Sequence, residues 1–161
     1  MTVTNVDKDF ERLTLTVTAE FAAPIERVWQ LWADARQLEG WWGPPTFPAT
    51  VVEHDLTPGG TVTYFMTGPE GGRYGGWWRI TAVNPLKSLE FIDGFADEHG
   101  VPVEGMPTTT VQMTLTEHDG GTRMELRSTF DTREQMDQLI GMGAVEGMTA
   151  ALNQIDALLG A

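Results

Sequence analysis

The last stretch of the chain, residues 132–159, constrains the fold most, because its apolar residues recur in steps of three and four. This spacing places them in one stripe along a helix, which Asp131 or Thr132 can cap and Gly160 can end. A helix this long, apolar on one side, needs a large partner surface, so we expect the preceding segments to wrap around it. The stripe consists of Met136, Leu139, Ile140, Met142, Val145, Met148, Leu152, Ile155, Leu158 and Leu159.

Seven segments upstream have the composition and period-two spacing of β-strands, with turn-forming glycines, prolines and asparagines between them. Two short helices, 24–36 and 38–42, are expected after the first strand, and Pro44 prevents the second from continuing. The pattern predicts an α+β fold, in which a curved seven-stranded antiparallel sheet wraps around the long C-terminal helix. The strands are expected at 13–21, 49–56, 61–67, 73–83, 87–94, 109–117 and 122–130.

The domain organisation is inferred from the length of the chain and from the absence of repeats or linkers in its sequence. The 161 residues contain no internal repeat, low-complexity segment or linker, so we predict a single domain over 1–161. Residues 1–11 precede the first predicted strand and are expected to form a flexible N-terminus. They lack the apolar segment of a signal peptide, which favours a cytoplasmic location.

Charge and composition exclude several classes of function. The formal net charge of −13 repels phosphate backbones and anionic lipids, so neither nucleic acid nor membrane is an expected partner. The absence of cysteine excludes disulfides, a thiol nucleophile and cysteine-bound metal. His54, His99 and His118 are far apart in the sequence, so we expect no metal and no cofactor.

Candidate acids and bases are scattered, and no nucleophile motif or phosphate-binding loop is present, so no catalytic residue is assigned. Asp55 is expected to face solvent or to cap a turn. Asp93 shares the parity of Leu89 and Phe91, so it either points inward, where it would orient a polar ligand group, or caps the end of its strand.

The strongest functional signal is the six tryptophans, two tyrosines and eight methionines. Methionine adapts to irregular shapes and aromatic rings give large apolar surfaces, so these residues either line a pocket or fill the core. Glycines in the last helix either leave space for a ligand or allow close packing. The candidate ligand-binding residues are Trp32, Trp41, Trp42, Tyr64, Met66, Tyr74, Trp78, Phe91, Phe95, Met113, Met142, Gly143 and Met148.

Short motifs along 13–160 carry a family resemblance in their order. They are Phe21-Ala22-Ala23-Pro24, Trp41-Trp42-Gly43-Pro44, Pro58-Gly59-Gly60, Gly76-Trp77-Trp78, Gly105-Met106-Pro107 and Glu146-Gly147-Met148. Together they resemble the START/polyketide-cyclase (SRPBCC) superfamily, and within it the group related to the C-terminal domain of the activator of the heat-shock-protein-90 ATPase. The resemblance implies the helix-grip fold and often an apolar cavity between helix and sheet. It does not imply a single function.

Three functions are therefore considered. The first is non-catalytic or weakly catalytic binding of an apolar or aromatic small molecule in the cavity. The second is an enzyme of the cyclase/aromatase or hydrolase kind, in which Tyr64, Tyr74, Asp93 or a histidine acts with cavity water. The third is a co-chaperone-like module with a protein partner. The chain is expected to be a monomer or a homodimer.

Overall fold

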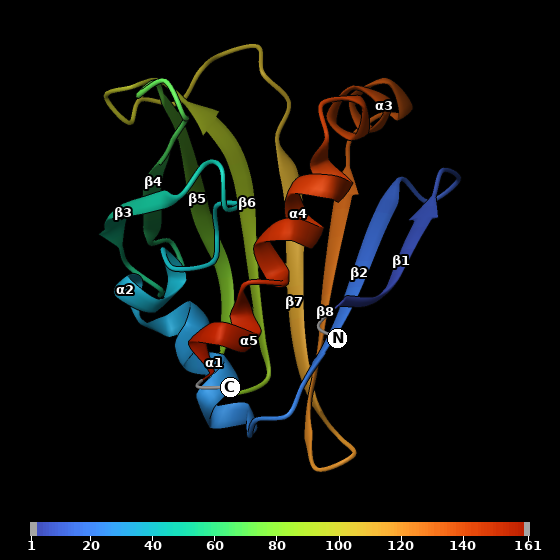
Figure 1. The fold of residues 1–161 in the computed structure, drawn as a ribbon. Helices are drawn as coiled ribbons and strands as arrows, with labels where there is room; N and C mark the ends of the chain where they lie inside the picture. The colour runs from blue at the N-terminus through green and yellow to red at the C-terminus, as the bar shows by residue number, and fades with distance from the viewer. Residues whose placement is uncertain (1–2, 160–161) are drawn as a thin grey trace.

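The computed structural model describes residues 3–159, which form one large antiparallel sheet and a small set of helices (Figure 1). The predicted end of the last helix at Gly160 lies outside the described residues. The elements are β1 (Val3–Asp9), β2 (Thr14–Phe21), α1 (Ile25–Ala33), α2 (Ala35–Leu38), β3 (Ala49–His54), β4 (Thr61–Thr67), β5 (Arg73–Asn84), β6 (Ser88–Ala96), β7 (Thr109–His118), β8 (Gly121–Phe130), α3 (Arg133–Gly141), α4 (Ala144–Leu152) and α5 (Ile155–Leu158).

The sheet has eight strands in the order β1-β2-β8-β7-β6-β5-β4-β3, so the α+β class is confirmed and the predicted count of seven strands is wrong. The additional strand is β1, which lies in the segment expected to be a flexible N-terminus and pairs with β2. No side chain of β1 is fully buried. The strand therefore lacks the apolar alternation by which the others are recognised in the sequence.

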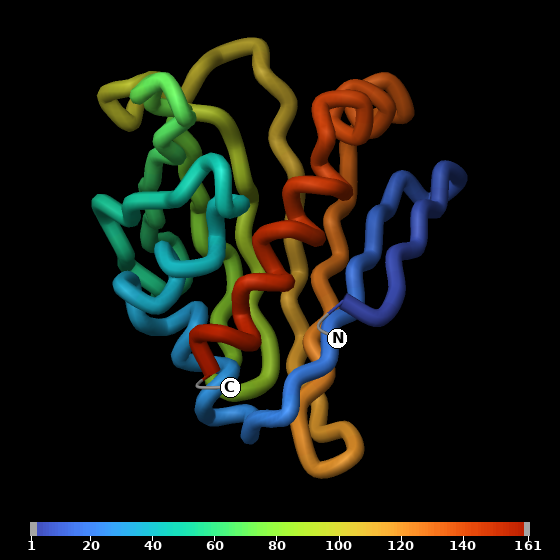
Figure 2. The backbone as a smooth tube through the Cα atoms, in the orientation of Figure 1, coloured from blue at the N-terminus to red at the C-terminus, as the bar shows by residue number. Residues whose placement is uncertain are grey.

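The predicted long C-terminal helix is also wrong, because residues 132–159 form three shorter helices, α3, α4 and α5 (Figure 2). The break between α3 and α4 falls at Gly143. Its φ of +94° is a left-handed conformation, which glycine adopts without steric strain because it has no Cβ atom. Met142 is the C-cap of α3, and Gly143 is the N-cap of α4. The apolar spacing continues across this break, so periodicity alone does not reveal it.

The helices α4 and α5 cross one face of the sheet and bury their apolar side chains against it (Figure 1). Leu152 and Ile155 are fully buried, as is Met136 of α3. The far end of this segment is tied to α1, because Arg27 Nη2 donates a hydrogen bond of 2.6 Å to the carbonyl oxygen of Leu158. None of the helices within residues 3–159 has the length and apolar content needed to cross a membrane.

Candidate ligand pocket

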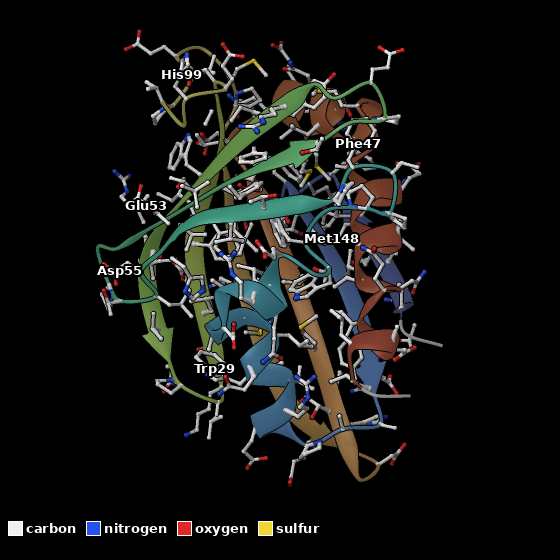
Figure 3. All side chains as sticks on the ribbon, turned by 60° about the vertical axis from the view of Figure 1, so that its left-hand side comes forward. Trp29, Phe47, Glu53, Asp55, His99 and Met148 are labelled. Atoms are coloured by element: carbon white, nitrogen blue, oxygen red, sulfur yellow. The ribbon has the colours of Figure 1, made fainter. Side chains whose placement is uncertain are left out.

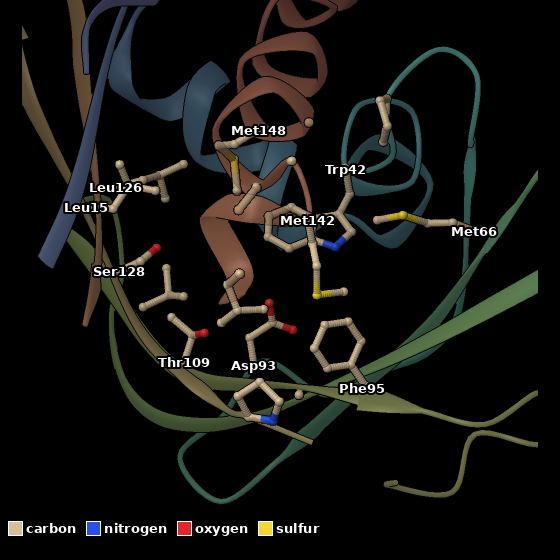
Figure 4. Close-up of a pocket in the computed structure, with 18 of the residues that line it drawn as sticks. Leu15, Trp42, Met66, Asp93, Phe95, Thr109, Leu126, Ser128, Met142 and Met148 are labelled. Carbon is tan, nitrogen blue, oxygen red and sulfur yellow. The ribbon is translucent and has the colours of Figure 1, made fainter. Parts of the chain in front are cut away.

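An apolar pocket of about 370 Å³ lies between the sheet and the junction of α3 with α4 (Figure 4). Its volume falls within the usual range for small-molecule sites. Strands of the sheet supply one wall, and the turns after α2 and before β7 contribute Trp42, Pro44 and Pro107. The helical wall consists of Leu139, Met142, Gly143, Ala144, Gly147 and Met148. The strand residues are Leu15, Val17, Tyr64, Met66, Tyr74, Gly75, Asp93, Gly94, Phe95, Thr109, Val111, Leu126, Ser128 and Phe130.

The structure brings part of the predicted ligand-binding set together at this pocket. The residues of that set that line it are Trp42, Tyr64, Met66, Tyr74, Phe95, Met142, Gly143 and Met148. The remaining members do not line it, because they are fully buried in the core. They are Trp32, Trp41, Trp78, Phe91 and Met113.

Trp42 connects the core aromatics to the pocket. Its ring meets Trp78 edge-to-face at 4.7 Å, and Trp78 stacks on Phe91 at 4.0 Å. Tyr64 lies 6.0 Å from Trp42 on the pocket side. Aromatic pairs in these geometries add to the stability that burial already provides. A packed cluster of aromatic rings therefore lies beside the pocket, and Trp42 is the tryptophan of this cluster that lines it.

Several pocket residues were absent from the predicted site. Those on β2, β7 and β8 are mostly apolar, and the alternation places them on the inner face without indicating that they border a cavity. The polar ones are Asp93, Thr109 and Ser128. Asp93 carries a sequence signal, since its parity matches that of Leu89 and Phe91, and the structure places it inward.

A glycine on β5 makes the polar end of the pocket possible. Tyr64 of β4 pairs with Gly76 of β5, and its hydroxyl donates a 3.2 Å hydrogen bond to Oδ1 of Asp93 on β6. A Cβ atom at position 76 would lie 2.2 Å from Cζ of Tyr64. Only glycine therefore leaves room for the tyrosine ring to reach across β5 to the carboxyl group.

The Asp93 carboxyl group faces the pocket, and the residue is half-buried. Burial raises its pKa from 3.8 to about 7, against the smaller opposing effect of the Tyr64 hydrogen bond. Burial also raises the pKa of Tyr64 well above its usual range, and the nearby charge of Asp93 adds to the effect. Asp93 is thus a carboxyl group that changes charge near neutral pH inside an apolar pocket.

We expect this group to make folding stability depend on pH. Between about pH 4 and pH 7 the native state holds a proton that the unfolded chain has lost, so the free energy of unfolding falls by up to about 1.4 kcal/mol per pH unit as pH rises. Above pH 7 this contribution is constant. In urea unfolding at pH 5 to pH 8, Asp93→Asn should therefore gain stability relative to the parent up to pH 7 and no further. A difference independent of pH would contradict the assignment.

The three histidines stay apart from the pocket. His54 lies on β3 with its ring 2.9 Å from the carbonyl oxygen of Trp32, and His118 is 3.2 Å from Glu20. Figure 3 shows His99 in the loop at the upper end of the molecule and Asp55 at an edge, both distant from Met148 of α4. Within residues 3–159 no group of histidine and carboxylate side chains is arranged to hold a metal ion.

The fold places the chain in the START-like (SRPBCC) class, with an antiparallel sheet crossed by C-terminal helices and a pocket between them. A sequence model of the family described as "Activator of Hsp90 ATPase homolog 1-like protein" matches residues 22–160, and the chain belongs to this family. The comparison with curated proteins finds no significant match.

Solved structures of three bacterial proteins share the fold over nearly the whole chain. Protein Ms6760 from Mycobacterium smegmatis is 57% identical, with a TM-score of 0.91, covering 98% of this chain and 96% of its own. A protein from Arthrobacter aurescens is 50% identical, with a TM-score of 0.94 and coverage of 99% and 92%. A protein from Staphylococcus epidermidis is 27% identical, with a TM-score of 0.84 and coverage of 98% and 94%. None of these names states a ligand.

Proposed function

We propose that the protein binds an apolar small molecule in the pocket between its sheet and the α3–α4 junction. The observation that carries the proposal is a pocket of about 370 Å³ with mostly apolar walls and a few polar groups at one end. This combination is typical of small-molecule sites. Membership of a family whose fold often encloses such a cavity supports the same function.

Flexible methionines at the rim and interior fit this role. Met142 is 58% exposed at the end of α3, and Met66 and Met148 border the pocket from β4 and α4. Unbranched thioether side chains adapt to ligands of different shape. The pocket is therefore suited to a ring compound or a short branched chain.

Methionine methyl NMR tests where such a compound binds. We expect uncharged naphthylmethanol to shift the methyl signals of the methionines that line the pocket and to give intermolecular contacts with them. Those residues are Met66, Met142 and Met148. The internal controls are fully buried methionines that do not line the pocket, whose signals should move much less: Met113, Met124 and Met136. Saturating probe that shifts none of the first group would overturn the proposal.

A second candidate function is an enzyme of the cyclase/aromatase or hydrolase kind. It is favoured by Asp93, because general acid–base catalysis works best with a pKa near the working pH. A bound compound that changes mass on incubation with the parent, but not with Asp93→Asn, would support this candidate over simple binding. The expected cytoplasmic location, the oligomeric state and a protein partner stay predictions.

A further inference from the structure

The polar end of the pocket contains a carboxyl group without a cationic partner. Asp93 accepts one hydrogen bond, from Tyr64, and makes no ion pair within residues 3–159. Its side chain is only half-buried, because part of it faces the cavity. Figure 4 shows the carboxyl oxygens pointing into the space beside Phe95 and Met142. One oxygen, Oδ2, is therefore available to a ligand.

The charges around this oxygen select against anions. No lysine, arginine or histidine lines the pocket among the described residues, and Asp93 is its sole carboxylate. Tyr64 and Tyr74 are the other titratable groups that line it. The net charge of −13 acts in the same direction, since it attracts cations and repels anions.

Aromatic side chains complete the surroundings of the carboxyl group. Trp42, Tyr64 and Phe95 border the pocket together with Asp93. Aromatic faces attract organic cations, most strongly where water is excluded, and a carboxylate forms a charge-assisted hydrogen bond with an ammonium group. Both interactions offset the cost of removing the ligand's charge from water.

We propose that the preferred ligand has an apolar body and a single protonated amine, which donates a hydrogen bond to Oδ2 of Asp93. This inference rests on the proposed binding function and adds the class of ligand. The apolar body occupies the space beside α4, and the ammonium group lies at the Asp93–Tyr64 end. A neutral analogue fills the same space without the ion pair, and a carboxylate analogue is repelled.

Three probes with one ring system test the inference by calorimetric titration at pH 8. Naphthylmethylamine, naphthylmethanol and naphthoic acid differ chiefly in the charge of the head group. We expect the amine to bind at least about tenfold more tightly than the alcohol, and the acid to bind more weakly than both. Asp93→Asn should remove the preference for the amine over the alcohol. The exposed residue Asp7 supplies a control, since Asp7→Asn removes the same charge outside the pocket.

A pH series on the parent tests the same ion pair without a substitution. The amine stays protonated from pH 6 to pH 8, while Asp93 loses its proton near pH 7, so amine affinity should rise about tenfold over this interval. Alcohol affinity should stay constant. An alcohol that binds as tightly as the amine at pH 8 overturns the amine preference alone. Failure of every probe to bind overturns the amine preference and the proposed function together.

Discussion

Truncation after Phe130 is expected to abolish cooperative unfolding. The deletion removes α3, α4 and α5, in which Met136, Leu152 and Ile155 are fully buried. Burying one such side chain contributes roughly 1.5–3 kcal/mol, and a domain of this size is stable by only about 5–15 kcal/mol in total. The deletion also exposes the sheet face that these helices cover. Thermal melts followed by circular dichroism and calorimetry provide the measurement.

Deletion of β1 is the matched control for this truncation. It removes a terminal element whose side chains are at most half-buried and leaves β2 as the edge of the sheet. We expect a lower melting temperature with cooperative unfolding retained. A chain ending at Phe130 that still melts cooperatively near the parent temperature would contradict the role assigned to the C-terminal helices.

Period-two alternation predicts most of the sheet. The expected strands 13–21 and 61–67 correspond to β2 (Thr14–Phe21) and β4 (Thr61–Thr67). Alternation assigns residues to the wrong face where a β-bulge inserts one extra residue into a strand. On β3, a bulge between Val51 and Glu53 leaves two consecutive residues, Val52 and Glu53, exposed. No separate pattern in the sequence marks this extra residue.

The sequence predicts which side chains of the candidate site face the interior of the fold, but not which of them border the pocket. Trp41 and Trp42 are neighbours in the chain, yet one is fully buried against Trp32 and the other reaches the pocket. Trp78 is also an inward-facing residue, but other rings cover it. Whether an inward side chain meets a void or another side chain depends on the packing of elements distant in sequence. Composition alone cannot separate the two.

Substitution of Gly147 by a larger residue is the most direct way to fill the pocket. It lies inside α4 and lines the pocket, and a Cβ atom added there meets no neighbouring atom within 4 Å. Gly143 is unsuitable for such a test, because its φ of +94° strains any larger residue whatever space is available. A leucine at 147 would therefore occupy ligand space, and removal of a glycine from a helix interior favours the helix by about 0.5–1 kcal/mol.

Titration of naphthylmethanol into Gly147→Leu, Gly141→Leu and the parent tests the central claim most directly. A Cβ atom added at Gly141 also meets open space, but this residue ends α3 and does not line the pocket. We expect the parent and Gly141→Leu to bind one equivalent with equal affinity. Gly147→Leu should lose at least about tenfold in affinity while melting at or above the parent temperature, as a filled void requires. Equal binding by all three proteins, or a Gly147→Leu variant destabilised by about 1–3 kcal/mol through overpacking, would contradict the ligand pocket.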